Sequence, residues 1–428
     1  MESLSKRDVL VYDYGLFGIF LGWALAQDFR KVYLFKPWMA PFPMPHDQWV
    51  GQDMPGITRV DSYEDTKRIV KENGGLFVFP DVGDGDKQLE LRKDGCNVFG
   101  AGESGELEFN RTLFKNKLKE RGLAVPQYGV VTGIDDLVSL CRKQNDLWIK
   151  LDVENRGILE TKHHETYKTS IQWLDKLAHD LGWLRNITKF MWEKPVGEVE
   201  GGSDQFESNG VILPRCLLGW EDKGDGYVAK VIDTDKLPAP VKRVNEAMAP
   251  IYKKYKTCGA TSSEIRTGEP GREKEPFFID ACRRFGNPPG ASITANCKNI
   301  SRVMWEVSQG NMITPEYLKK YVAELPIDHP CADKESLPFD ITEKEMSNIK
   351  LRNCCYVKEK TQYYSIPFQW SNTVAKAVGV GDTLEEAEFN ALDAAENFKL
   401  TGKTYNKLTF ENLDEILAKA AKYGWGRF

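Results

Sequence analysis

Strand-like and helical patterns alternate through the first hundred residues, and this alternation constrains the fold more than any other feature of the chain. Apolar, strand-like runs occupy residues 9–12, 31–35, 76–79 and 96–99. Helical patterns fill residues 15–27 and 63–73. Such alternation predicts a parallel sheet with helices on its faces. Ligands of such sheets bind beyond the carboxyl ends of the strands, which here points to Asp13 and Asp81.

The rest of the chain combines longer helices with extended segments. Helical patterns occupy residues 105–122, 169–181, 236–255, 383–399 and 413–422, with another from 299 onward. Extended patterns occupy residues 147–151, 190–196, 262–267, 276–282, 353–366 and 374–380. A proline- and charge-rich stretch at 326–340 predicts a domain boundary. These patterns predict a multi-lobed protein of mixed α/β and α+β class.

Charge and cysteine content exclude several classes of function. The chain carries 58 basic and 63 acidic side chains, a net charge of −5, so it lacks the electrostatic footprint of a duplex-binding protein. Its nine cysteines form no CxxC pair, which argues against a zinc site and is typical of reduced thiols in a cytoplasm. Asp8 and Asp13 interrupt the apolar N-terminal stretch, so we expect no membrane span and a cytoplasmic location.

Six spaced segments follow one another in an order that is more informative than any one of them. The chain has no P-loop, HExxH or GxSxG motif. The segments read VFGAGESGELEFNRTLFKNKLKERGLAVPQY, LWIKLD, MWEKPVGEVE, SSEIRT, FIDACRRFGNPPG and VAKAVGVGDTLEEAEFNALDAAE. In this order they resemble the ATP-grasp superfamily and, within it, the glycinamide ribonucleotide synthetases. The resemblance spans roughly residues 98–400.

The resemblance implies a division into three domains. Residues 1–100 would form an N-terminal Rossmann-like, pre-ATP-grasp substrate domain. Residues 101–335 would form the ATP-grasp domain, with a lid at about 123–195. Residues 336–428 would form a small C-terminal α+β domain, in which a GDT turn precedes a helix. Asp382 or Thr383 can cap that helix.

The resemblance also assigns nucleotide-binding roles. Lys115 and Lys150 match the two lysines that contact the phosphates. Glu193 and Val196 would bracket the adenine through main-chain groups, with Lys194 between them in the same hinge. Glu200 stands where the superfamily keeps a carboxylate for the ribose hydroxyls. The implied cofactors are ATP and Mg²⁺.

The metal and catalytic residues follow from the fourth and fifth segments. Glu264 in SSEIRT and Asp280 in FIDAC match the magnesium carboxylates, which suits a hard cation that prefers carboxylate oxygen. Asn287 stands where the family has an aspartate after RFG, and it joins them as a candidate ligand. Arg284 and Arg266 are the candidate catalytic residues, because a guanidinium can neutralise charge as the bond to the γ-phosphate breaks.

Three departures from the family pattern qualify the assignment. Cys282 occupies a position where the family has asparagine, and a neutral thiol is a poor magnesium ligand. The glycine-rich phosphate loop is reduced to VENRGILET, with the single Gly157, where Arg156 could supply a guanidinium instead. The N-terminal glycine motif that holds the amine substrate of the purine enzyme is absent. We therefore expect the acid or the amine to differ.

The implied function is an ADP-forming carboxylate–amine ligase that acts through an acyl phosphate. Its partners would be a small carboxylate, with glycine or another amino acid as the family-based candidates, and an amine that could be carried by a nucleotide. A monomer or a homodimer would serve. Two alternatives stay open: a catalytically inactive nucleotide-binding protein on the same scaffold, and a Rossmann-type oxidoreductase that uses the glycines of GLFGIFLG.

Overall fold

The N-terminal part of the chain forms a parallel sheet. The computed structural model describes residues 3–37, 48–152, 161–222, 224–368 and 371–428. Five parallel strands lie in the order β3 (Ile57–Val60), β2 (Lys31–Phe35), β1 (Asp8–Tyr12), β4 (Leu76–Val78) and β5 (Asn97–Phe99). The helices are α1 (Gly18–Leu25), α2 (Tyr63–Glu72) and α3 (Gly85–Lys93). This confirms the predicted parallel sheet and adds β3 and α3, which were not predicted.

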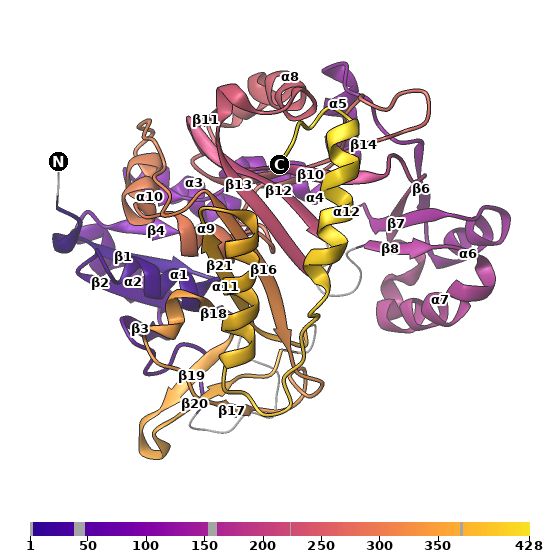
Figure 1. The fold of residues 1–428 in the computed structure, drawn as a ribbon. Helices are drawn as coiled ribbons and strands as arrows, with labels where there is room; N and C mark the ends of the chain where they lie inside the picture. The colour runs from indigo at the N-terminus through magenta and orange to yellow at the C-terminus, as the bar shows by residue number, and fades with distance from the viewer. Residues whose placement is uncertain (1–2, 38–47, 153–160, 223, 369–370) are drawn as a thin grey trace.

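The second sheet runs through the middle of the molecule (Figure 1). Its strand order is β15-β14-β10-β12-β13-β16-β21-β18, with β11 paired to β10. The strands are β10 (Val199–Ser208), β11 (Val211–Ile212), β12 (Arg215–Asp222), β13 (Gly226–Asp233), β14 (Gly259–Thr267), β15 (Phe277–Cys282), β16 (Tyr321–Asp328), β18 (Ile349–Leu351) and β21 (Thr373–Gly381). This sheet carries the adjacent strands that were predicted at 262–267 and 276–282.

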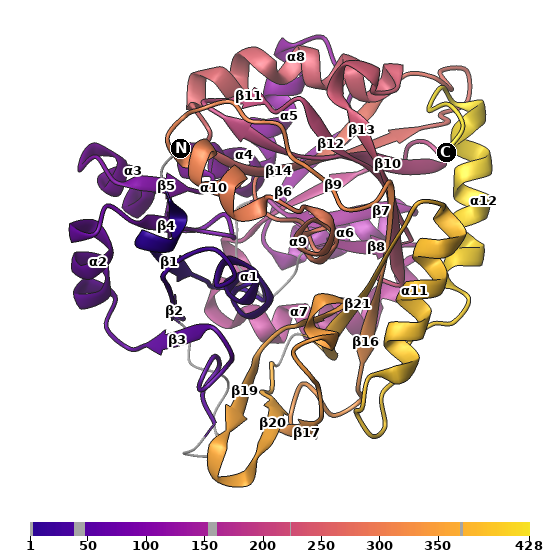
Figure 2. The ribbon, with the colours of Figure 1, turned by 60° about the vertical axis from the view of Figure 1, so that its left-hand side comes forward.

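Helices cover both faces of this sheet. The helices are α8 (Ala239–Tyr255), α9 (Gly290–Asn296), α10 (Ile300–Ser308), α11 (Leu384–Asn397) and α12 (Thr409–Lys422). Helices α11 and α12 lie along one face, where α11 packs on β16 and β21 (Figure 2). Helices α9 and α10 pack between the sheet and helix α1, so the two sheets share one hydrophobic core.

The region that was predicted as a lid forms a separate layer, to the right in Figure 1. Its four strands lie in the order β6 (Tyr128–Thr132), β9 (Lys189–Glu193), β7 (Leu147–Leu151) and β8 (Thr161–His164). Helices α6 (Ile134–Lys143) and α7 (Tyr167–Leu181) pack on this sheet around an apolar cluster of their own. We refer to residues 128–193 as the lid.

The prediction of one continuous helix over residues 105–122 is wrong, because the structure has two helices there. The chain forms α4 (Glu106–Phe109) and α5 (Arg111–Glu120), with a break at Asn110. Asn110 leaves the helical conformation, and its side-chain Oδ1 accepts a hydrogen bond from the amide of Leu113 at 2.8 Å. A side-chain cap thus starts α5.

The C-terminal part adds a small sheet and extends the large one. Strands β17 (Leu337–Phe339), β20 (Gln362–Ser365) and β19 (Cys354–Val357) form the small sheet, while β18 and β21 join the central sheet. Thr383 caps α11 by accepting from the amide of Glu386, as predicted. The domain boundaries themselves remain predictions. Over the described residues, the structure has no helix with the length and apolarity needed to cross a bilayer.

Candidate active site

A largely buried row of alternating charges lies where the lid meets helix α5 and strand β15. Five side chains form this row, which we call the charge row: Lys115, Glu193, Lys150, Asp280 and Arg111. Each contacts the next at 2.6–2.9 Å. The row brings together four of the residues predicted from the resemblance and carries three cations against two carboxylates.

Lys150 stands at the centre of the charge row. It lies on the lid strand β7, and its ammonium is 2.9 Å from Glu193 Oε2 and 2.7 Å from Asp280 Oδ2. Burial alone would lower the pKa of Lys150, but the carboxylates of Asp280 and Glu193 outweigh it and raise this pKa. The lysine therefore stays charged although only 3% of it is exposed.

Asp280 is held as an anion by its neighbours. Burial by itself would raise its pKa, yet the Lys150 and Arg111 cations lower it well below the ordinary value. Its carboxylate accepts from Arg111 Nη1 at 2.6 Å and from Lys150 Nζ at 2.7 Å. The predicted metal carboxylate is thus charged at neutral pH and already has two cations beside it.

Lys115 and Glu193 close the other end of the row. Lys115 Nζ lies 2.6 Å from Glu193 Oε1 and donates to the carbonyl of Ile279 at 2.8 Å. Burial lowers the pKa of Lys115. Glu193 was predicted to act through its main chain at the end of β9. Its side chain points inward to both lysines, which the sequence interpretation did not anticipate.

Arg111 was missed by the sequence interpretation. It is the first residue of α5, and its guanidinium also donates to the carbonyl of Leu151 at 3.1 Å. Arg111 lies four residues before Lys115, so both occupy one face of the same helix. That spacing is visible in the sequence. The prediction of one continuous helix over 105–122 did not show that a new helix starts at Arg111.

The two predicted magnesium carboxylates are cross-strand partners. Glu264 on β14 pairs with Asp280 on β15, beside an irregularity in the strand register. Within the described residues no group of three or more His, Cys, Asp or Glu side chains could hold a metal ion. Two carboxylates suit Mg²⁺ that keeps water and phosphate ligands, rather than a closed protein cage. The donor set therefore fits a metal that arrives with a nucleotide.

Cys282 lies two residues beyond Asp280 on the same strand. Its thiol lies 3.6 Å from the carbonyl of Arg284, and burial raises the pKa of the thiol. The side chain is therefore neutral, which agrees with its being a poor magnesium ligand. Asn287, the third predicted ligand, lies in the turn after β15 and lines a separate cavity with Arg352 and Lys376.

The two predicted catalytic arginines lie in different surroundings. Arg284 Nε donates to Glu108 at 2.8 Å and lies 3.6 Å from Asp81 Oδ1, so it links β15 to the carboxyl edge of the N-terminal sheet. Arg266 lies opposite Glu200 on paired strands, with 3.4 Å between Nε and Oε2. Glu200, the predicted ribose ligand, is thus beside a cation.

The remaining predicted residues belong to the hinge after the lid. Lys194 points away from the charge row, because its Nζ donates to the carbonyl of Asn145 at 2.8 Å. Val196 is buried. The reduced phosphate loop, with Arg156 and Gly157, lies outside the described residues. Asp13 follows the carboxyl end of β1, where the sequence predicted a ligand. It accepts hydrogen bonds from the amides of Gly15 and Gly18 and pairs with Lys36 at 3.0 Å.

Comparison with known proteins gives matches in structure alone. No family model matches the chain, and no curated protein sequence does. A phosphoribosylamine–glycine ligase from Thermotoga maritima superposes with a TM-score of 0.67 at 17% identity, over 94% of this chain and 99% of that one. The biotin carboxylase domain of the Hydrogenobacter thermophilus 2-oxoglutarate carboxylase, in complex with MgADP and bicarbonate, gives 0.63 at 11% identity, over 97% and 99%.

An L-amino acid ligase from Bacillus licheniformis gives a TM-score of 0.55 at 14% identity, over 95% of this chain and 100% of that one. All three are ATP-grasp proteins. This chain has the ATP-grasp fold. The fold class predicted from the ordered segments is confirmed, and the match covers 94% of the chain.

Proposed function

We propose that the protein is an ATP-dependent, ADP-forming ligase that joins a small carboxylate to an amine. The observation that carries the proposal is the charge row, with Glu264 opposite Asp280 on the neighbouring strand. Phosphoryl transfer needs cations on the polyphosphate and carboxylates that can hold a metal. The row supplies both at the junction between the lid and the central sheet.

In this proposal a substrate carboxylate attacks the γ-phosphorus of ATP, and the bond to the bridging oxygen breaks. ADP leaves, an acyl phosphate forms, and an amine then displaces phosphate to give the amide. Lys115, Lys150 and Arg111 hold positive charge along the polyphosphate and lower the cost of the charge that develops. Mg²⁺ held by Glu264 and Asp280 would neutralise the phosphate oxygens.

The contacts of Asp280 suggest how the site could prepare for this ligand. Lys150 and Arg111 both donate to its carboxylate in the described structure. Phosphate oxygens can accept those same hydrogen bonds, because both cations prefer oxyanions. When the polyphosphate takes over part of these contacts, Asp280 becomes available to a metal. Binding of nucleotide and of Mg²⁺ should therefore be mutually dependent.

The direct test is the release of ADP and phosphate in the presence of MgCl₂, with a panel of amino acids and candidate amines. We expect at least one acid–amine pair to stimulate release. The Lys150→Met variant should lose that stimulation, whereas Lys176→Met, on the exposed side of α7, should retain it. Absence of turnover with every pair, together with absence of ATP binding, would contradict the proposal.

A second candidate is a nucleotide-binding protein without ligase activity. The neutral, half-buried thiol of Cys282, in the position expected for an asparagine, favours it. In that case MgATP would raise the melting temperature, yet no acid–amine pair would release ADP. The Cys282→Asn variant separates the two functions, since it should improve turnover in a ligase with impaired metal geometry and produce none in a binding protein.

A further inference from the structure

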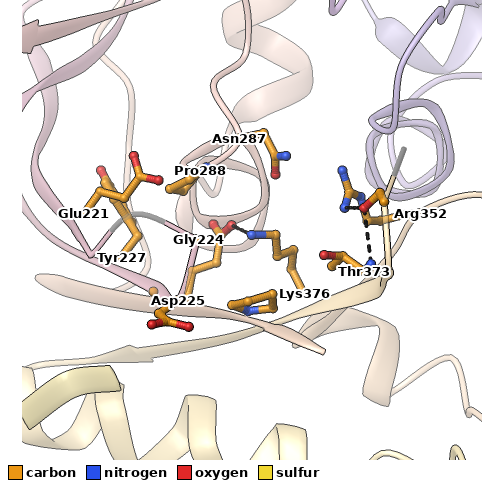
Figure 3. Close-up of a pocket in the computed structure, with 13 residues that line it drawn as sticks. Glu221, Gly224, Asp225, Tyr227, Asn287, Pro288, Arg352, Thr373 and Lys376 are labelled. Carbon is orange, nitrogen blue, oxygen red and sulfur yellow. Dashed lines mark hydrogen bonds and ion pairs between the residues drawn. The ribbon is translucent and has the colours of Figure 1, made fainter. Parts of the chain in front are cut away.

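A small cavity lies at a junction of segments that are far apart in the sequence. It has a volume of about 140 Å³ and is bounded by the β12–β13 turn, the turn that carries Asn287, and strands β16 and β21. Figure 3 shows Glu221 and Asp225 on one side of this space and Arg352 on the other, with Asn287 and Lys376 between them. Water occupies about 30 Å³ per molecule in the liquid, so the space suits a small molecule or the end of a larger one.

Arg352 is the decisive residue of the cavity. It follows strand β18 and is only 4% exposed. Its Nη1 donates to Ser371 Oγ at 3.1 Å. Among the described residues no carboxylate lies within ion-pair distance of this guanidinium, and Asp13, Glu324 and Asp328 act on it only at longer range. A buried charge normally has a paired partner.

Lys376 adds a second cation on the same face. It is 8% exposed, and its Nζ lies 3.5 Å from Glu324 Oε1. Glu324 is itself 1% exposed, and its other oxygen accepts from the amide and hydroxyl of Ser292. Glu324 therefore pairs with Lys376 but does not come within ion-pair distance of Arg352.

Lys350 lies nearby on strand β18 but outside the lining of the cavity. It lies opposite Lys376 across strands β18 and β21, is 1% exposed, and donates to the carbonyl of Met346 at 3.3 Å. Arg352 and Lys376 are thus the two buried cations of the cavity lining, and among the described residues only Lys376 has a carboxylate within ion-pair distance. Burial lowers the pKa of Arg352 to about 10, an effect that the more distant carboxylates of Glu324, Asp328 and Asp13 only partly oppose.

An anion would give Arg352 the ion-pair partner that it lacks among the described residues, and the cavity offers room for one. We propose that the cavity is an oxyanion subsite, in which Arg352 and Lys376 bind the carboxylate or phosphate group of a small molecule. Its assignment to a substrate rests on the proposed ligase function. The turn that carries Asn287 directly follows β15, the strand of Asp280, and Asn287 lies seven positions after Asp280, so a short stretch of chain connects the subsite to the charge row.

The residues on the other side of the cavity limit the charge that the second end of the ligand can carry. Glu221 and Asp225 come from the end of β12 and the following turn, and both line the space. The acidic group of Asp225, opposite two cations, suits a molecule with an oxyanion at one end and a donor or positive charge at the other. An α-amino acid has this polarity, whereas a dianionic acid does not.

The test measures stabilisation of the purified protein by glycine, potassium acetate and potassium phosphate, against potassium chloride at equal ionic strength. We expect a saturable rise in melting temperature with at least one oxyanion. A response to glycine or acetate identifies a carboxylate subsite, and a response to phosphate alone identifies a phosphate subsite. The Arg352→Gln and Lys376→Met variants should each raise the half-saturating concentration about ten-fold or more, because each loses a charged hydrogen bond.

Lys350→Met is the matched control, since this buried lysine lies opposite Lys376 but does not line the cavity. Lys350→Met should keep the response of the native protein. Lys376→Arg, which retains a positive charge at this position, should also keep the response that Lys376→Met weakens. If Arg352→Gln does not fold, Lys376→Met carries the test. No response to any oxyanion, an equal response in the cavity variants, or equal loss in Lys350→Met would overturn the proposal. MgADP binding, measured on the same samples, tests the ligase proposal separately. If the cavity variants bind MgADP with native affinity, a failed oxyanion test contradicts the subsite proposal alone.

Discussion

At the scale of single residues, Lys150 links the two carboxylates of the charge row. Its replacement by Met leaves Glu193 and Asp280 with one cation each. We expect loss of roughly 3 kcal/mol of unfolding free energy, because each of the two carboxylates loses one of its two ion-pair partners in a largely buried site. The half-saturating concentration of MgATP should rise about ten-fold or more. Urea unfolding and calorimetric titration measure the two effects, and Lys176→Met should change neither.

Asp204 should make stability depend on pH. Burial raises its pKa to about 6, and its carboxylate accepts from the hydroxyl of Tyr227. Because the folded protein holds this proton more tightly than the unfolded chain, the stabilising contribution is complete below about pH 4 and is lost as pH rises to about 6. Asp204→Asn should therefore gain about 3 kcal/mol over the native protein at pH 7, but not at pH 4. Equal differences at both pH values would contradict this assignment.

At the scale of elements, the N-terminal cap of α5 positions two members of the charge row. Asn110→Ala removes the bond to the amide of Leu113 and should cost about 1 kcal/mol of stability. Arg111 and Lys115 lie on this helix, so a less stable helix should also hold their cations less firmly, and nucleotide affinity should fall as well. Asn110→Ser keeps a capping oxygen and should retain both properties. Chemical unfolding and MgADP titration of the two variants provide the comparison, and equal behaviour would argue against the cap.

The elements also show what the sequence could predict. Periodicity identified the parallel sheet, and the ordered segments placed Lys115, Lys150 and Asp280 in one site, because each sits on an element with a strong pattern of its own. The position of Arg111 in the site was not predicted, because the break at Asn110 depends on a single capping side chain. The cavity was not predicted for another reason: Arg352 and Lys376 come together through the pairing of β18 with β21, and Asn287 joins them from the turn before α9, which packs on β16 and β21. Such tertiary contacts leave no local signature.

At the scale of the whole molecule, the charge row is the junction between two separately packed bodies. The lid has its own apolar cluster, distinct from the core shared by the two larger sheets. Lys150 and Glu193 belong to the lid, whereas Lys115 and Asp280 belong to α5 and β15. A separately packed unit can open at a lower free energy than the main core. We therefore expect the lid amides to exchange hydrogen faster than those of β10 in the absence of nucleotide.

MgATP should change this difference, because a ligand that contacts both bodies is bound only when they are together. By linkage, binding stabilises the closed arrangement in proportion to the saturation of the site. Native-state hydrogen exchange should show protection gained mainly in β7 and β9, with little change in α11. In Lys150→Met the gain should shrink, while a ligand-independent lid would exchange equally with and without MgATP. The second result would mean that the charge row only holds the lid in place and does not sense the nucleotide.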